Sequence, residues 1–134
     1  MRKLLAGLVM AVIGNIAVLA EDKPLQIVID GKPNAQIVIA AENRPRMTTL
    51  AALELRKYVE NISGARLPIA TSPDASLPLK IYVGKSLETE KLGLKTEDLQ
   101  YGAYRIVSGP DWLVLLGKDF DFDPVKHKLP LSRG

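Results

Sequence analysis

The chain has 134 residues, of which 47% are hydrophobic and none is cysteine. Without the first twenty residues, which have the character of a leader, 114 remain, enough for one domain and too few for two. Removing Arg2 and Lys3 leaves 16 basic against 15 acidic residues, a net charge of +1, which argues against nucleic acid or an anionic membrane as a partner. The aromatic residues are spread out, which argues against a stacking platform for bases.

Residues 1–20 have the order of a secretory signal peptide. The positive pair Arg2-Lys3 precedes the apolar run Leu4–Ala20, and the charged pair Glu21-Asp22 follows it. The alternative is an uncleaved membrane anchor, but this run contains Asn15 and is shorter than the roughly 20 residues that a spanning helix needs. We therefore expect a secreted or periplasmic protein, with no membrane attachment after cleavage. Without disulfides, packing alone must stabilise it.

Two segments rich in β-branched residues come first in the mature chain. Leu25–Asp30 and Gln36–Ala40 predict neighbouring strands of one sheet, separated by the turn formers of Gly31–Asn34. Their apolar runs, Ile27–Ile29 and Ile37–Ile39, are continuous, which predicts burial on both faces of the sheet.

A helical period begins after these segments. Asn43 is the predicted N-terminal cap, Pro45 lies in the first turn, and Gly64 is the predicted stop. Apolar side chains at spacings of three and four predict one buried face, made of Met47, Ala51, Leu55, Tyr58, Val59 and Ile62. We expect this long helix to cross over between the strands Gln36–Ala40 and Lys80–Val83.

The second half of the chain predicts short strands between loops. The extended pieces are Leu67–Ala70, Lys80–Val83 and a hairpin of Tyr101–Val107 with Trp112–Leu116, turning at Ser108–Asp111. The intervening segments are a proline-containing loop, Thr71–Leu79, and a charged loop that contains one helical turn, Leu87–Asp98. The order predicts an α/β (α+β) fold: a mixed β-sheet of four to five strands with one long helix packed on one face.

One helix covers only one face of such a sheet. The tail, residues 120–134, is polar and contains Pro124 and Pro130, so it is a poor cover for the other face. We therefore expect another helix, another domain or a partner chain to cover the second face.

Two short motifs approach a ligand-binding pattern and depart from it. Val83–Ser86 resembles the end of a phosphate-binding loop, but Leu79 stands where that loop needs glycine, so Gly84 is predicted to end a strand. Asp119–Asp123 places carboxylates at alternate positions, as a calcium loop does, but Pro124 and Pro130 replace its glycine and glutamate.

The remaining candidates for catalysis are also incomplete. His127 is the only histidine and lies between two lysines, so it forms neither a zinc site nor a triad by itself. Among the carboxylates, Asp30 leads into a turn, and Glu42 is explained as a favourable charge near a helix start. Asn61-Ile62-Ser63 matches the N-glycosylation acceptor within the last helical turn. We predict no catalytic, cofactor-binding or metal site and no cofactor.

The order of the hydrophobic segments is similar to that of a known domain. The segments are residues 37–40, 51–69 (ending Ile-Ser-Gly-Ala-Arg-Leu-Pro-Ile), 81–86, 99–106 and 113–119. Together they resemble the N-terminal domain of α-glucuronidase-type glycoside hydrolases, and the related domain that precedes the catalytic barrel in β-hexosaminidase-like enzymes. The resemblance covers roughly residues 25–119.

The resemblance implies a helix-covered sheet that packs against a (β/α)₈ barrel, in which the catalytic carboxylates lie. We expect a signal peptide (1–20), a domain of this type (21–119) and a polar tail (120–134), truncated before the barrel. The implied function is an exported non-catalytic accessory domain of a carbohydrate-degrading system, whose partner is a glycoside hydrolase barrel or another chain.

The alternative is a free-standing carbohydrate-binding or protein-interaction module. Carbohydrate binding would need exposed aromatic rings, and the candidates are Tyr82, Tyr101, Tyr104 and Trp112. Their positions within predicted strands favour the core instead.

Overall fold

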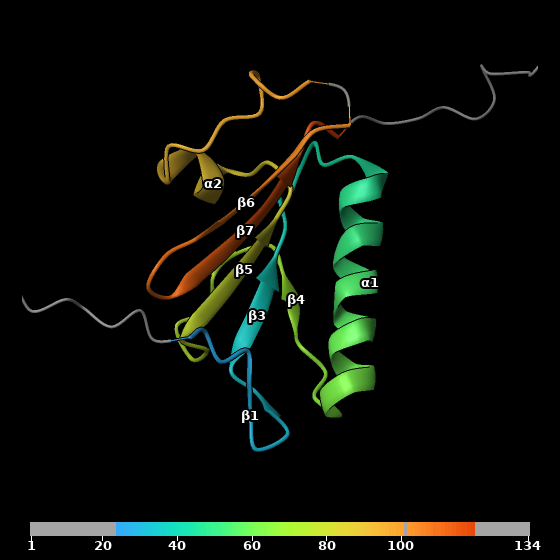
Figure 1. Cartoon of the computed structure of the whole chain (residues 1–134), viewed down its shortest axis with the longest axis vertical. Helices are drawn as coiled ribbons and strands as arrows, with labels where there is room; N and C mark the ends of the chain where they lie inside the picture. Colours follow the sequence, from blue (N-terminus) through green and yellow to red (C-terminus); the bar gives the residue numbers. More distant parts are fainter. Residues whose placement is uncertain (1–23, 101, 120–134) are drawn as a thin grey trace, which may run out of the picture.

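The computed structural model describes residues 24–100 and 102–119; the predicted signal peptide, Tyr101 and the tail lie outside these ranges. The described chain forms a five-stranded sheet with the order β4-β3-β5-β7-β6 and a long helix, α1, on one face (Figure 1). The strands are β3 (Ala35–Val38), β4 (Ile69–Ala70), β5 (Leu79–Val83), β6 (Tyr104–Ser108) and β7 (Trp112–Gly117). Neighbouring strands are parallel except β6 and β7, which form the predicted antiparallel hairpin. The predicted fold class is confirmed.

The first predicted strand is wrong in extent and in partner. Of Leu25–Asp30, only β1 (Val28–Ile29) is a strand, and it pairs with β2 (Lys32–Pro33) in a separate two-stranded ribbon. Asp30 and Gly31 both have positive φ, 49° and 71°, and such a two-residue turn reverses the chain at once. Ile29 is consequently exposed, whereas β3 is buried on both faces, as predicted.

Helix α1 (Arg46–Ser63) confirms the long helix, and Gly64 ends it in the left-handed conformation, as predicted. The prediction of Asn43 as the cap is wrong, because Pro45 occupies the N-cap position and no side chain caps the helix. Asn43 instead has a φ of 52° and bends the preceding loop, a conformation that asparagine tolerates.

The predicted buried face of α1 is partly wrong. Leu55 and Val59 pack against the core beneath the helix, but the fully buried positions are Thr48 and Ala52. Their small side chains allow the helix to approach the sheet closely. The other predicted positions are exposed, namely Met47, Ala51, Tyr58 and Ile62. The apolar arc of α1 is therefore wider than the area that the sheet covers.

The sequence predicted that the long helix leads from β3 to β5. In the structure, α1 leads from β3 to β4 instead. The chain then reaches β5, on the other side of β3, through residues 71–78. The buried Gln36 holds this loop: its amide donates to the Asp74 carbonyl at 2.8 Å and accepts from the Asp74 N–H at 3.1 Å. The loop thereby covers part of the sheet face opposite α1.

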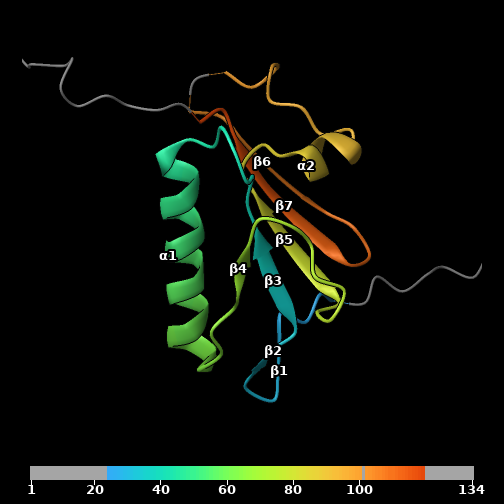
Figure 2. The ribbon, with the colours of Figure 1, turned by 180° about the vertical axis from the view of Figure 1, so that it is seen from behind.

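The second face of the sheet is covered, and one of the three expected covers, another helix, contributes to it. The short helix α2 (Leu87–Lys91) and the loop after it lie over the face opposite α1 (Figure 2). Leu94 and Trp112 pack there against a second buried cluster, made of Val38, Tyr82, Val114 and Leu116. The prediction of a loop with one helical turn for Leu87–Asp98 is confirmed, because α2 has only five residues. The chain covers this face with its own loops.

Candidate functional site

A crevice of about 750 Å³ opens at the carboxyl ends of the parallel strands. Its lining comes from the residues that follow β3, β4, β5 and β7. The chain leaves β3 toward α1 on one face of the sheet and leaves the neighbouring β5 toward α2 on the other face (Figure 1). This reversal is a topological switch point, the place where open α/β sheets characteristically bind ligands. The volume is in the range of ordinary ligand pockets.

The loop between β3 and α1 forms one wall and is held by Arg44. The guanidinium of Arg44 donates to the carbonyl oxygens of Ala40 and Ala41, at 2.7 and 2.9 Å, and to the Thr49 hydroxyl at 3.0 Å. These bonds tie the loop both to the end of β3 and to the first turn of α1. The wall is therefore fixed without any ligand.

The opposite wall is the start of α2. The Ser86 hydroxyl accepts from the Thr89 N–H while the Thr89 hydroxyl accepts from the Ser86 N–H, so a capping box fixes the first turn. Lys85 Nζ lies 2.9 Å from Glu97 Oε1 and 3.6 Å from Glu90 Oε1. The hydrogen bond from Lys85 lowers the pKa of Glu97 to about 2, and the same bond raises the pKa of Lys85.

The base of the crevice joins α1 to the ends of β5 and β7. Gly84 follows β5 with a φ of 76° and lies directly against Thr48, the buried residue in the first turn of α1. The Thr48 hydroxyl lies 3.4 Å from Asp119 Oδ2, two residues beyond β7. Glu42 and Lys118 at the rim are exposed and form no ion pair within the described ranges.

The structure separates most of the residues that the sequence singled out. Glu42 lies at the crevice, whereas Asp30 lies in the turn of the β1–β2 ribbon at the opposite end of the sheet (Figure 1). Gly84 ends β5, as predicted, and Asn61 is exposed in the last turn of α1. His127 and the greater part of the calcium-like run lie outside the described residues.

The crevice as a whole was missed by sequence reasoning. Its polar residues, Thr48, Thr71, Ser72 and Asp119 among them, come from separate segments and form no local motif. The sequence could have indicated the crevice only through the positions of these residues, because each residue follows or faces the carboxyl end of a strand in the same parallel sheet.

A second feature is an apolar surface on the α1 side of the sheet. Ile106 pairs with Leu115, and Leu115 packs against the core beneath α1, so Ile106 and its neighbour at i−2, Tyr104, also point to the α1 side. Helix α1 does not reach them: Tyr104 is 76% and Ile106 is 61% exposed.

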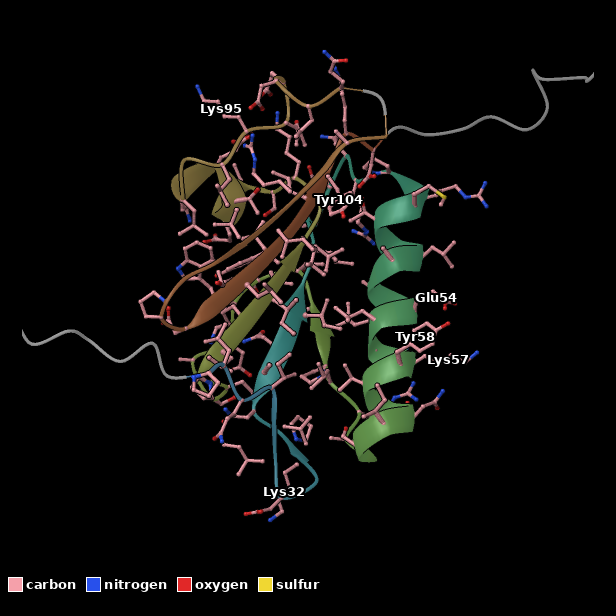
Figure 3. The ribbon with its side chains drawn as sticks, viewed as in Figure 1. Lys32, Glu54, Lys57, Tyr58, Lys95 and Tyr104 are labelled. Atoms are coloured by element: carbon pink, nitrogen blue, oxygen red, sulfur yellow. The ribbon has the colours of Figure 1, made fainter. Side chains whose placement is uncertain are left out.

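Helix α1 carries a matching exposed row. Met47, Ala51, Tyr58 and Ile62 repeat at helical spacing along one line of α1, and Tyr58 and Tyr104 both lie on the near side of the molecule in Figure 3. We call these six residues, Met47, Ala51, Tyr58, Ile62, Tyr104 and Ile106, the open face. It combines an exposed row of α1 with the two residues of β6 that the helix leaves uncovered.

The aromatic candidates for sugar stacking divide between core and surface. Tyr82 is buried, which raises the pKa of its hydroxyl, and Trp112 packs on the same cluster, as favoured from the sequence. Tyr104 is exposed on an edge strand, contrary to the core assignment, and Tyr101 lies outside the described residues.

Across the described residues, no three His, Cys, Asp or Glu side chains gather as a metal-binding group would require. Neither helix in this part of the chain combines the length and the apolar character needed to cross a membrane. Comparison with protein-family models, curated proteins and solved structures finds no match for this chain. The resemblance to the α-glucuronidase N-terminal domain therefore stays a prediction.

Proposed function

We propose that this chain is an exported, non-catalytic accessory domain of a carbohydrate-degrading system, and that its open face packs against the catalytic barrel of a glycoside hydrolase. The observation that carries the proposal is the open face itself. Its six members are exposed apolar or tyrosine side chains beside the core beneath α1, and the charged Glu54 lies on the same line of α1 between Ala51 and Tyr58.

Such a surface favours a protein partner over solvent. Monomeric proteins rarely expose large contiguous apolar patches, and the patches that they do expose mark interaction sites. Two of the six residues, Tyr58 and Tyr104, are tyrosines, a type that commonly anchors interfaces. Glu54 and Lys57 lie beside Tyr58 on the outer side of α1, where they provide the polar rim that interfaces have (Figure 3).

The positions of the candidate catalytic carboxylates support the non-catalytic part of the proposal. The carboxylates considered for glycoside hydrolysis, Asp30 and Glu42, belong to opposite ends of the sheet and do not act on one substrate bond. A free-standing carbohydrate-binding or protein-interaction module is the alternative, and the identity of the partner on the open face discriminates between them.

Site-specific photocrosslinking in the native host tests the proposal. A photoreactive residue replaces Ile106 in the full chain, and the crosslinked product is identified by mass spectrometry. We expect the crosslinked protein to be a glycoside hydrolase. The control is a matched chain with the photoreactive residue in place of Lys95, in the loop after α2 (Figure 3), and we expect no crosslink to a glycoside hydrolase from it. Crosslinks to a second copy, to unrelated proteins only, or equally from both positions would refute the proposed partner.

A matched pair of variants measures the contribution of the open face once the hydrolase is in hand. Ile106→Asp places a charge within the open face and is expected to weaken the complex at least ten-fold, the effect of losing an interface anchor. Leu53→Asp likewise places a charge on an exposed apolar position, but on α1 outside the open face, and should leave the affinity unchanged. The full chain alone should show no glycosidase turnover.

A further inference from the structure

We propose that the crevice at the carboxyl ends of β3, β5 and β7 is a binding site for a small neutral saccharide. This site is separate from the open face and does not depend on the proposed partner. The argument rests on the charge of the lining, on its hydrogen-bonding groups and on its apolar contacts.

The charge of the lining disfavours anions. It contains four carboxylates, those of Glu42, Glu88, Glu90 and Asp119, against the two amines of Lys85 and Lys118. Lys85 is already engaged by Glu90 and by Glu97, and Glu88 pairs with Lys91 at 2.8 Å. An entering ligand therefore meets two remaining carboxylates and one amine, so the side-chain charge of the lining does not favour phosphate, sulfate or uronates.

Two further ligand classes fit poorly. Bases and other flat aromatic groups require a stacking partner, and the lining contains no aromatic side chain among the described residues. A metal ion requires several converging ligands, and the described residues contain no such group.

A neutral saccharide matches the groups that remain. Hydroxyl side chains line the crevice from several segments, among them Thr71 and Ser72 after β4, Ser86 before α2 and Thr96 after α2. Sugar hydroxyls donate as well as accept, so they bond both to these hydroxyls and to the carboxylates of Glu42 and Asp119, and bonds to carboxylates are the stronger ones.

The apolar part of the lining suits the C–H face of a sugar ring. Ala40 and Ala41 contribute after β3, and Leu87, the first residue of α2, is 74% exposed at the edge of the crevice. Burial of the Leu87 side chain under a sugar ring would remove apolar surface from water, which favours binding. Because Arg44 and the capping box already fix both walls, binding requires little ordering of the protein.

Nuclear magnetic resonance on the ¹⁵N-labelled full chain tests the site. The probes are D-glucose, D-xylose and their β-1,4-linked disaccharides, with D-glucuronate and inorganic phosphate as anionic counterparts. We expect at least one neutral sugar to shift the amide signals of Glu42, Asn43 and Lys85 saturably, and both anions to bind at least ten-fold more weakly. Absence of saturable shifts at the crevice for every neutral probe, or tighter binding of either anion, would overturn the proposal.

Three variants separate binding from folding. Glu42→Gln removes one charged acceptor at the rim and is expected to weaken sugar binding about ten-fold, whereas Glu54→Gln, the same change on the outer side of α1, should have no effect. Ser72→Trp fills the crevice from an exposed loop position and should abolish binding. Unchanged amide signals in the sheet establish that each variant is folded. Equal affinities for all three variants, or sugar-induced shifts confined to the open face, would contradict the assignment.

Discussion

Substitution of Gly84 by alanine is the sharpest test of how α1 is joined to the sheet at the base of the crevice. Gly84 has a φ of 76°, and a Cβ atom there would lie 2.6 Å from Thr48 Cγ2 and 3.0 Å from Thr48 Oγ1. Thr48 is almost fully buried, and its β-branched side chain has few alternative rotamers. Neither the backbone nor the neighbour therefore accommodates the added methyl group.

The expected loss has two parts. The left-handed conformation costs alanine about 1–2 kcal/mol, and forcing an extra carbon into a packed contact typically costs about 1–3 kcal/mol more. The free energy of unfolding should therefore fall by about 2–5 kcal/mol. Gly93→Ala is the matched control, because Gly93 has a φ of 73° with open space around it, so only the backbone cost of about 1–2 kcal/mol applies.

Urea unfolding of the full chain, followed by far-ultraviolet circular dichroism, measures both losses. Thr48→Ser removes the methyl group that lies 2.6 Å from the added carbon. The loss of unfolding free energy caused by Thr48→Ser should therefore be smaller in the Gly84→Ala chain than in the native chain, by about 1–2 kcal/mol. The reasoning fails if Gly84→Ala costs no more than Gly93→Ala, or if the effects of Gly84→Ala and Thr48→Ser simply add.

Two further predictions concern the loops that cover the face opposite α1. Gln36→Ala removes both hydrogen bonds to the Asp74 backbone and leaves a cavity, so the free energy of unfolding should fall by about 2–3 kcal/mol in the same urea assay, while the exposed Gln100→Ala should change it by less than about 0.5 kcal/mol. Lys85→Met should return the pKa of Glu97 from about 2 toward its ordinary value of 4.5, measured by side-chain carboxyl resonances during an acid titration. Because the pKa of Glu97 is lowered in the folded protein, its pairing with Lys85 stabilises the fold above pH 4.5 and is lost as the pH falls toward 2, and an unshifted titration in Lys85→Met would contradict this account.

The elements predicted correctly share a local cause. Helix α1 and its stop at Gly64 follow from helical spacing and from a glycine that adopts positive φ. The β6–β7 hairpin follows from the turn formers between its strands. The five-residue α2 follows from the weak periodicity of its segment. In each case the deciding interactions lie within a few residues along the chain.

The error in the buried face of α1 has a different cause, which is competition between distant segments. The apolar arc of α1 allowed more than one buried face, and the close approach of Gly84 to Thr48 selected the one that leaves Met47 and Tyr58 in solvent. The error in the first strand is local, because the two-residue turn at Asp30-Gly31 pairs β1 with β2, and the neighbours of β3 are then β4 and β5.

The candidate site shows the same division. Sequence patterns were sufficient for most of the secondary structure elements, because short-range spacing carries that information. The crevice and the open face emerge only when the strands are ordered. Strand order places Glu42, Thr48, Lys85 and Asp119 around one space, and it places Tyr104 and Ile106 beyond the reach of α1. Strand order depends on contacts between residues far apart in the chain, which no short-range pattern records.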